Sequence, residues 1–448
     1  MSPAPAMHRC RRALLLSYHF PPEVASGAIR IAKFAKYLPR CGWEPLVVSN
    51  RFSRDAELDS ALAKETERTA RVWRVRYLDP WRLPDLLRRS TNGNGHEAGP
   101  RVRADPAPGA PGPLGWWLRE ALSTPDRMAA WALSAVVAGW WLARSHPWDV
   151  VFSSGPPWSA HLAGYMLKRS TGRPWVADFR DPWLNSPFRK PTRYFEHIHQ
   201  RLESAVLRAA DLVVANTTAL AADLSERHPG TEEKTATITN GYDPEDFASR
   251  VDRPPVFRVL HAGELYGTRN PRPFLQAAAN LLARGSIPRP QLHIHLMGPA
   301  DDFDGQTVPD MIRDLGLGDV AEVSGSVPYG VSLREAERAA VLLAIQPGTS
   351  VQVPRKVYDY LGARRPILAL TPEGATADLV RRSGIGLVVP PDDVGAIQSA
   401  LAAVYQGWRA GQQPQPNPEV VQHCTVPALT RRLAAAFESL CPSSEGGP

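Results

Sequence analysis

The chain has 448 residues, a formal net charge of +7 and 43% hydrophobic residues, as expected for a globular protein of about two domains. The modest charge and the lack of any run of five basic residues argue against a nucleic-acid partner, whereas an anionic substrate or membrane surface fits. Four distant cysteines (Cys10, Cys41, Cys424 and Cys441) without CxxC spacing predict neither a zinc site nor a disulfide framework, and so favour the cytoplasm.

The first half of the chain alternates short apolar runs with amphipathic stretches. Three arginines precede the apolar residues 13–16, which hints at a secretion signal, but the run is shorter than the roughly 7–15 residues that a signal needs. We therefore predict a first strand over 13–20. Further strands are predicted over 44–50, 148–157, 174–179 and 211–217, and helices over 28–42, 159–172 and 193–210. This alternation is typical of a parallel sheet covered on both faces.

Two segments of the first half stand apart. Residues 88–114 are rich in Gly, Pro and Ala, which predicts a disordered insertion. Residues 128–143 form the longest apolar stretch, shorter than the ~20 residues that span a bilayer. One interpretation is a buried core helix. The other is a helix at a membrane interface, because rings such as those of Trp131, Trp140 and Trp141 sit at the level of the lipid headgroups.

The same alternation restarts after a polar, Pro-containing linker over 248–257. Strands are predicted over 257–263, 292–298, 321–327, 341–347, 366–372 and 386–390, with helices between them, one around 272–284. An apolar helix over 426–440 is expected to pack back on the first unit. The fold class is therefore α/β. The predicted divisions are an N-terminal domain over 1–247, a C-terminal domain over 248–425, and a last helix with a flexible tail over 426–448.

Ligands of open α/β sheets bind beyond the carboxyl ends of the strands, so the loops there are candidate sites. After the first strand, Ser26 and Gly27 lead into a helix, where glycine permits close backbone approach and free N–H groups attract phosphate. The alternative is a plain turn. Asp178, Arg180 and Asp181 follow a buried strand, either as an Asp–Arg pair that holds the loop or as contacts to a sugar or acceptor.

The second half offers a cationic pair. Gly263 follows a strand, and Arg269 stands where a helix begins, a position suited to an anionic group. Lys356 lies at the start of a later helix with Asp359 three residues on, so both can share one helix face. The alternative is that Lys356 and Asp359 simply pair with each other.

Five segments in this order resemble the family-four group of retaining glycosyltransferases over about 13–405: HFPP…SGAIR, DFRDPW, ADLVVANT…ITNGYD, GELYGTRNP and VPRKVYDYLGARRPILAL. The resemblance is to the branch often found in exopolysaccharide and lipopolysaccharide clusters. It implies the GT-B fold, two Rossmann-like doubly wound domains facing across a cleft. It also implies a retaining, hexosyltransferase-like transfer from a nucleotide-diphosphate sugar to an acceptor in polysaccharide, glycolipid or glycosylated-metabolite synthesis.

The resemblance implies roles for residues of the second domain, which would bind the donor. Arg269 and Lys356 resemble the pair that holds the donor diphosphate. Asp359 falls at the second acidic position of a Glu-x7-Glu motif, which usually holds the ribose, whereas Val351 replaces the first Glu, which usually contacts the sugar. The other implied donor contacts are Ser26, Gly27, Gly263, Met297, Gly298 and Val327.

In the first domain, which would bind the acceptor, many relatives carry His where this chain has Arg180. The catalytic expectation therefore falls on Arg180 together with Asp178 and Asp181. No convincing Asp-x-Asp metal site is present, since Asp301-Asp302 and Asp392-Asp393 fit turns better. We expect metal independence and no cofactor beyond the nucleotide-sugar co-substrate.

Two other hypotheses stay open. The chain could be a GT-B sugar-nucleotide epimerase or phosphorylase, or a non-catalytic scaffold, an idea that the missing first Glu supports. The acceptor, whether a glycan, a lipid-linked sugar or a small metabolite, is not specified by the sequence. A contact with the inner face of the membrane is also expected, and the Trp-rich segment 116–148 is the candidate for it.

Overall fold

The computed structural model describes residues 11–23, 26–51, 58–79, 113–184, 192–247, 254–412 and 414–441. The chain forms two compact units. Unit 1 is drawn from Met1–Ala215, Leu224–Thr237 and Thr430–Pro448, and unit 2 from Asn216–Asp223 and Ile238–Leu429. Unit 2 thus takes over at Ile238, earlier in the chain than the linker that the sequence suggested. Most of the predicted insertion, 88–112, lies outside the described residues, and a helix begins at Pro113.

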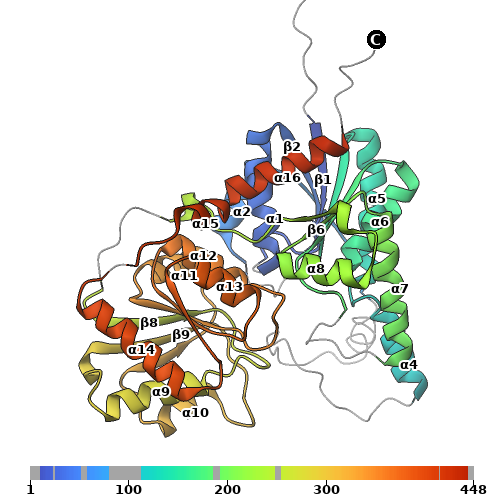
Figure 1. Ribbon diagram of the computed structural model, residues 1–448. Helices are drawn as coiled ribbons and strands as arrows, with labels where there is room; N and C mark the ends of the chain where they lie inside the picture. Colours follow the sequence, from blue (N-terminus) through green and yellow to red (C-terminus); the bar gives the residue numbers. More distant parts are fainter. Residues whose placement is uncertain are drawn as a thin grey trace, which may run out of the picture. The chain divides into compact units, whose positions relative to one another are not determined.

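Unit 1 is built on seven parallel strands in the order β3-β2-β1-β4-β5-β6-β7 (Figure 1). The strands are β1 (Arg11–Leu16), β2 (Trp43–Asn50), β3 (Arg71–Val75), β4 (Val150–Gly155), β5 (Trp175–Phe179), β6 (Leu212–Ala215) and β7 (Thr235–Thr237). The helices are α1 (Ser26–Tyr37), η1 (Leu38–Cys41), α2 (Ser60–Glu67), α4 (Pro113–Leu122), α5 (Ala129–Ser145), α6 (Ser159–Thr171), α7 (Arg193–Ala209), α8 (Thr218–Arg227, which starts in unit 2), η2 (Glu232–Lys234) and α16 (Val426–Leu440).

Side chains of β4 alternate between two covered faces of this sheet. The Phe152 ring packs edge-on against Phe34 of α1 and Phe437 of α16, with ring centroids 6.2 and 5.9 Å apart. The next residue, Ser153, points the other way and shares a 2.8 Å hydrogen bond with His161 of α6. Since both faces of the inner strands are buried, these strands are largely apolar, and this is why apolar runs predicted them.

Unit 2 repeats the arrangement with six parallel strands in the order β10-β9-β8-β11-β12-β13 (Figure 1). The strands are β8 (Phe257–Ala262), β9 (Leu292–Met297), β10 (Ala321–Ser324), β11 (Val341–Ile345), β12 (Ile367–Leu370) and β13 (Gly386–Val389). The helices are η3 (Pro244–Asp246), α9 (Arg272–Ala283), η4 (Arg289–Gln291), α10 (Val308–Asp314), α11 (Tyr329–Glu337), α12 (Arg355–Ala363), α13 (Ala375–Arg382), α14 (Val394–Arg409) and α15 (Pro418–His423).

Both sheets place their first strand beside their fourth, so the strand order reverses between β1 and β4 and between β8 and β11. This is the Rossmann order, and its reversal point is where such sheets bind ligands. Several boundaries differ from those predicted. β1 ends at Leu16, before the turn that Ser17 makes to the carbonyl of His19, and not at residue 20. The edge strands β3 and β7 were missed because β3 is only half-buried and β7 has three residues.

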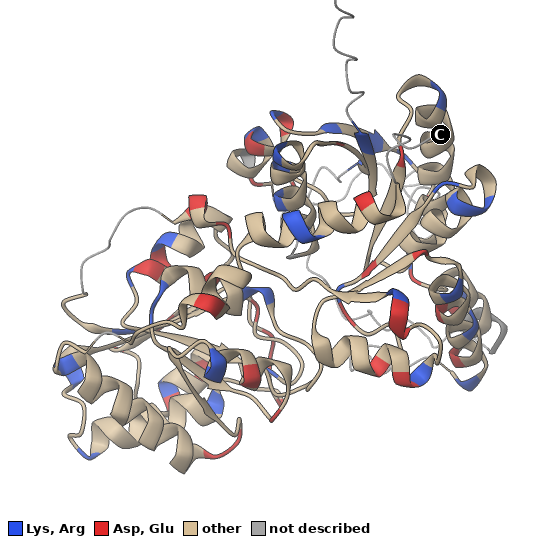
Figure 2. Cartoon of the chain, turned by 45° about the horizontal axis from the view of Figure 1, so that its top comes forward, with Lys and Arg blue, Asp and Glu red and all other residues tan. Residues whose placement is uncertain are grey.

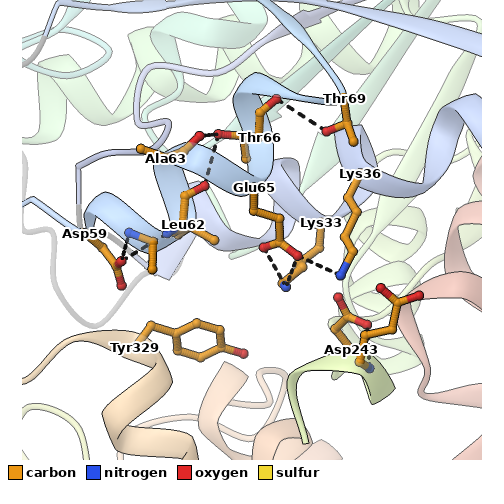
Figure 3. A network of polar contacts seen from close by, with 12 residues as sticks. Lys33, Lys36, Asp59, Leu62, Ala63, Glu65, Thr66, Thr69, Asp243 and Tyr329 are labelled. Atoms are coloured by element: carbon orange, nitrogen blue, oxygen red, sulfur yellow. Dashed lines mark hydrogen bonds and ion pairs between the residues drawn. The ribbon is translucent and has the colours of Figure 1, made fainter.

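The network in Figure 3 includes a connection between α1 and α2 beside the unit 1 sheet. Lys33 and Lys36 of α1 both reach the carboxylate of Glu65, with nitrogen–oxygen distances of 3.0 and 2.6 Å. Asp59 caps the start of α2 by accepting from the backbone N–H groups of Ala61 and Leu62. These two lysines of α1 therefore connect it to α2.

The last helix, expected over 426–440, is α16 and packs on unit 1. Phe437 is fully buried, and its ring lies 5.2 Å from Trp43 of β2 as well as against Phe152. Arg432 donates a 2.7 Å hydrogen bond to the carbonyl of Thr237, the last residue of β7. The helix thus covers the middle of the sheet and is fastened near its edge.

Replacement Phe437→Ala should destabilise unit 1 by about 3–5 kcal/mol, because it removes a fully buried ring and leaves a cavity. Urea unfolding followed by tryptophan fluorescence measures the effect. The matched control Glu438→Ala, at an exposed position of the same helix, should change stability by less than about 0.5 kcal/mol. Equal behaviour of the two variants would contradict this packing.

Candidate functional site

Unit 2 brings Arg269 and Lys356 together at the reversal point of its sheet. Arg269 lies in the loop between β8 and α9, and Lys356 is the second residue of α12, which follows β11. The two charges are close enough for Arg269 to lower the pKa of Lys356. Two cations far apart in the sequence therefore occupy one region, beside the start of α12, as the sequence had suggested.

The backbone beside these cations is tightly packed. Gly263 and Gly298 directly follow β8 and β9, and both have a φ of +127°, which side-chain-bearing residues rarely adopt. A Cβ atom on Gly263 would lie 2.8 Å from Lys356 Nζ, and one on Gly298 would lie 2.7 Å from the carbonyl group of Gly263. The lack of a side chain at Gly263 therefore makes room for Lys356, and the lack of one at Gly298 lets the backbone after β9 lie close to Gly263.

Lys356 is held by His261, a residue that the sequence did not single out. His261 is fully buried in β8, and its Nε2 lies 2.9 Å from Lys356 Nζ. Its Nδ1 lies 3.0 Å from the carbonyl oxygen of Leu343, which can only accept, so Nδ1 carries the proton and Nε2 accepts from the lysine. Burial, with Lys356 and Arg269, holds the pKa of His261 well below its ordinary value, which keeps the ring neutral.

The same environment acts on Lys356 itself. Burial and the nearby guanidinium of Arg269 hold the pKa of Lys356 well below its ordinary value, while the carboxylate of Glu264 opposes the shift. The cation is therefore costly in the ligand-free protein. An anion placed beside the lysine would stabilise its charged form and so oppose the shift in its pKa. The geometry therefore favours an anionic ligand.

Arg269 is oriented by two neighbours. Its Nε and Nη2 donate to the side-chain oxygen of Gln346, at 3.1 and 2.7 Å, and the guanidinium lies 4.6 Å from the ring centroid of Tyr266. Gln346 is buried directly after β11. This glutamine was also missed, although its position just beyond a buried strand is the signal that could have found it.

Asp359 does not pair with Lys356. Its carboxylate lies 2.9 Å from Arg355 and accepts a 3.0 Å hydrogen bond from the hydroxyl of Tyr329. Burial alone would lower the pKa of Arg355, but Asp359 and Tyr329 raise it above its ordinary value. The alternative of a Lys356–Asp359 pair is therefore wrong, and Lys356 is left to His261.

The other positions that the resemblance names lie at or shortly after the ends of neighbouring strands. Met297 ends β9 and is buried, and Val327, just before α11, packs half-buried against the same core. Val351, where the resemblance implies a missing Glu, lies in the loop before α12, and its carbonyl accepts a 2.5 Å hydrogen bond from Thr217. This position contributes backbone polarity and an apolar side chain.

In unit 1, Asp178 is a buried anchor. It is the second-last residue of β5 and has no exposed surface. Its carboxylate accepts from Arg30 of α1, Nε at 3.1 Å and Nη2 at 2.8 Å, and from the hydroxyl of Ser154 at 2.7 Å. Asp178 thus forms an Asp–Arg pair, but its arginine is Arg30 of α1 and not Arg180 of the same segment. This geometry favours a positioning role for Asp178.

Arg180 lies beside the start of α1. It donates to the carbonyls of Gly155 and Pro156 at the end of β4, and burial lowers its pKa against the opposing effect of Asp181 and Asp178. A Cβ atom on Gly27 would overlap the guanidinium. The missing side chain of Gly27 therefore makes room for Arg180. Ser26 and Gly27 form the first turn of α1, and Asp181 is half-buried.

The comparisons with known proteins agree with this architecture. Residues 27–241 match the family model described as a glycosyl transferase 4-like domain. The match covers just under half of the chain, most of it in unit 1. The comparison with curated proteins gave no match.

Solved structures of similar fold span both units. They include a glycosyltransferase from Rickettsia africae ESF-5 (TM-score 0.62, 14% identity, 98% of this chain and 100% of that one). Sucrose-phosphate synthase from Thermosynechococcus elongatus has a TM-score of 0.64 at 16% identity over 97% and 100% of the chains. Anabaena HepE (Alr3699), in complex with UDP and glucose, has a TM-score of 0.60 at 17% identity over 96% and 100%. The prediction of a GT-B fold with two Rossmann-like units is confirmed.

Lys356 should lose its proton at a lower pH than an ordinary lysine. Replacing Arg269 by Gln removes a neighbouring positive charge and should move the Lys356 pKa upwards. Nitrogen-15 NMR of labelled lysine side chains, with Lys356→Met to assign the signal, measures both. Arg272→Gln, which removes an exposed cation three residues away, should leave this pKa unchanged. An ordinary lysine titration at position 356 would contradict the arrangement.

Replacement Arg30→Met should destabilise unit 1 by about 3–5 kcal/mol, because it leaves the Asp178 carboxylate buried without its charged partner. The double variant Arg30→Met with Asp178→Leu should recover part of this loss. Urea unfolding measures both. A single variant as stable as the unchanged protein would argue against the anchoring role.

Proposed function

We propose that this protein is a glycosyltransferase that moves a sugar from a nucleotide-diphosphate sugar to an acceptor. The observation that carries the proposal is the convergence of Lys356 and Arg269 beside the start of α12, at the reversal point of the unit 2 sheet. The family-model match over 27–241 and the similar fold of HepE, whose structure contains UDP and glucose, support it. Within this proposal UDP is the first nucleotide to test.

The mechanism follows from charge development in unit 2. When the bond between the sugar and the diphosphate breaks, negative charge grows on the leaving group. Arg269 and Lys356 would neutralise it, and the free N–H groups at the start of α12 would add to the field. Because two fixed cations supply this charge, we infer that transfer requires no metal ion. The resemblance to family-four glycosyltransferases implies, in addition, that transfer proceeds with retention of configuration. Activity that disappears with EDTA and returns with Mg²⁺ would contradict metal independence.

Within this proposal, individual residues are assigned to the sugar, ribose and base of the donor. Val351 cannot donate a side-chain hydrogen bond, so sugar recognition at this position would use the backbone. Asp359 would meet the ribose while tied to Arg355 and Tyr329, which hold its carboxylate in place. Met297, Gly298 and Val327 would border the base. In unit 1, Arg180 and Asp181 stay the candidates for contact with sugar or acceptor.

The setting of the reaction is part of the proposal. We infer action in the cytoplasm in polysaccharide, glycolipid or glycosylated-metabolite synthesis, within the branch associated with exopolysaccharide and lipopolysaccharide clusters. No helix among the described residues is both long and apolar enough to cross a membrane.

Incubating donor without acceptor separates sugar transfer from the epimerase alternative, since an epimerase would yield a new sugar nucleotide. A non-catalytic scaffold would bind the nucleotide without turnover.

Replacements Arg269→Ala and Lys356→Ala should each lower the transfer rate by roughly 10²–10³, because each removes a cation from the developing diphosphate charge. The donor is found first by a thermal-shift panel of UDP, GDP, ADP and dTDP sugars, since a bound ligand raises the melting temperature. Rates then follow from released nucleoside diphosphate. The matched control Arg272→Ala, near Arg269 but exposed, should keep full activity. Full activity in both site variants would remove the basis of the proposal.

A further inference from the structure

Helix α5 has two apolar faces, only one of which is buried. Trp131, Ala132, Ala135, Val136, Gly139 and Leu142 point into unit 1. On the opposite side the large apolar side chains are between 41% and 61% exposed: Leu133, Val137, Trp140 and Trp141. Their spacing of three and four residues places them along one stripe of the helix. A surface helix ordinarily carries polar residues there.

Cations accompany this stripe, and acids are missing from it. The ring nitrogen of Trp140 donates a 2.7 Å hydrogen bond to Ser170, which ties the end of the stripe to the end of α6. Arg144 in the last turn of α5 and Arg169 in the last turn of α6 are exposed. Neither helix, both wholly within the described residues, contains Asp or Glu. Across the drawn chain as a whole, basic and acidic residues are mixed (Figure 2).

The two tryptophans differ in setting from Trp131. Trp131 is fully buried, and its ring packs edge-on against Tyr18 at 5.4 Å. The Trp140 and Trp141 rings lie at the surface, where an amphipathic indole suits the boundary between lipid tails and headgroups. Half of the helix thus matches the interpretation of a core helix and half matches that of an interfacial helix.

We propose that Leu133, Val137, Trp140, Trp141, Arg144 and Arg169, together the α5 face, bind the surface of a membrane that contains anionic phospholipid. The helix would lie in the plane of the interface, with its aliphatic side chains among the acyl chains and its arginines at lipid phosphates. A face that is apolar, carries two cations and has no acid fits such a surface by charge. The proposal goes beyond sugar transfer and does not depend on it.

The test uses the full-length protein and co-sedimentation with vesicles of phosphatidylcholine alone or mixed with phosphatidylglycerol. The unchanged protein should bind the anionic vesicles, more weakly as salt is added, and Leu133→Glu should abolish binding. The double variant Arg144→Gln with Arg169→Gln should lower the affinity for anionic vesicles by roughly tenfold or more. Leu387→Glu, which places the same charge on an exposed leucine of β13 in unit 2, should bind like the unchanged protein. Thermal unfolding confirms that each variant is folded.

Several results would overturn the proposal. The first is a failure of the unchanged protein to bind anionic vesicles, and the second is binding by a folded Leu133→Glu variant as strong as that of the unchanged protein. The third such result is an unchanged affinity of the Arg144→Gln, Arg169→Gln double variant for anionic vesicles. A dimer in analytical ultracentrifugation that Leu133→Glu dissociates, without vesicle binding, would assign the α5 face to a second copy of the chain and would equally overturn it. Donor binding, measured on the same preparations, reports on unit 2 separately.

Discussion

The hydrogen bond from Lys356 to a neutral His261 is the interaction on which the unit 2 site depends. It fixes the ammonium group beside Arg269, although burial and the second cation both oppose its charge. A neutral acceptor is necessary, because a protonated imidazole would repel the lysine. The carbonyl of Leu343 secures this state by accepting the proton of Nδ1. The position of the Lys356 ammonium group therefore depends on two residues of the sheet, His261 in β8 and Leu343 in β11.

From that contact the surrounding architecture follows. The lysine has room beside the end of β8 because Gly263 lacks a side chain, and Gly298 in turn lets the two backbone segments lie close together. Arg269 keeps its direction through Gln346, which emerges from β11 beside the same reversal point. Asp359, one turn along α12, is occupied by Arg355 and does not neutralise Lys356. The unit thus holds positive charge where a parallel sheet offers free loop backbone, the environment that phosphate groups require.

The fold was predictable because the inner strands are buried on both faces, and apolar runs are typical of such strands. The sequence also singled out Arg269 and Lys356, since cations that follow buried strands are visible as a pattern, although Arg269 lies in the loop before α9 and not at the helix start that the sequence suggested. It could not find His261, because a histidine within an apolar strand looks like core until its neighbour is known. It suggested an Asp–Arg pair within the 178–181 segment but could not indicate Arg30 as the partner of Asp178, since the two lie 148 residues apart. The edge strands and the exposed half of α5 likewise depend on tertiary surroundings that local spacing does not encode.

The placement of α16 has a consequence for the order in which the protein is made. The pocket for Phe437 is formed by Trp43 and Phe152, which leave the ribosome long before the helix that fills it. All of unit 2 except its short segment 216–223 is synthesised in between, from Ile238 to Leu429. Unit 1 therefore starts before unit 2 and is completed after it, and until α16 is made the aromatic surface of its sheet lacks this helix. All residues of unit 2 are therefore translated before the α16 residues that complete unit 1.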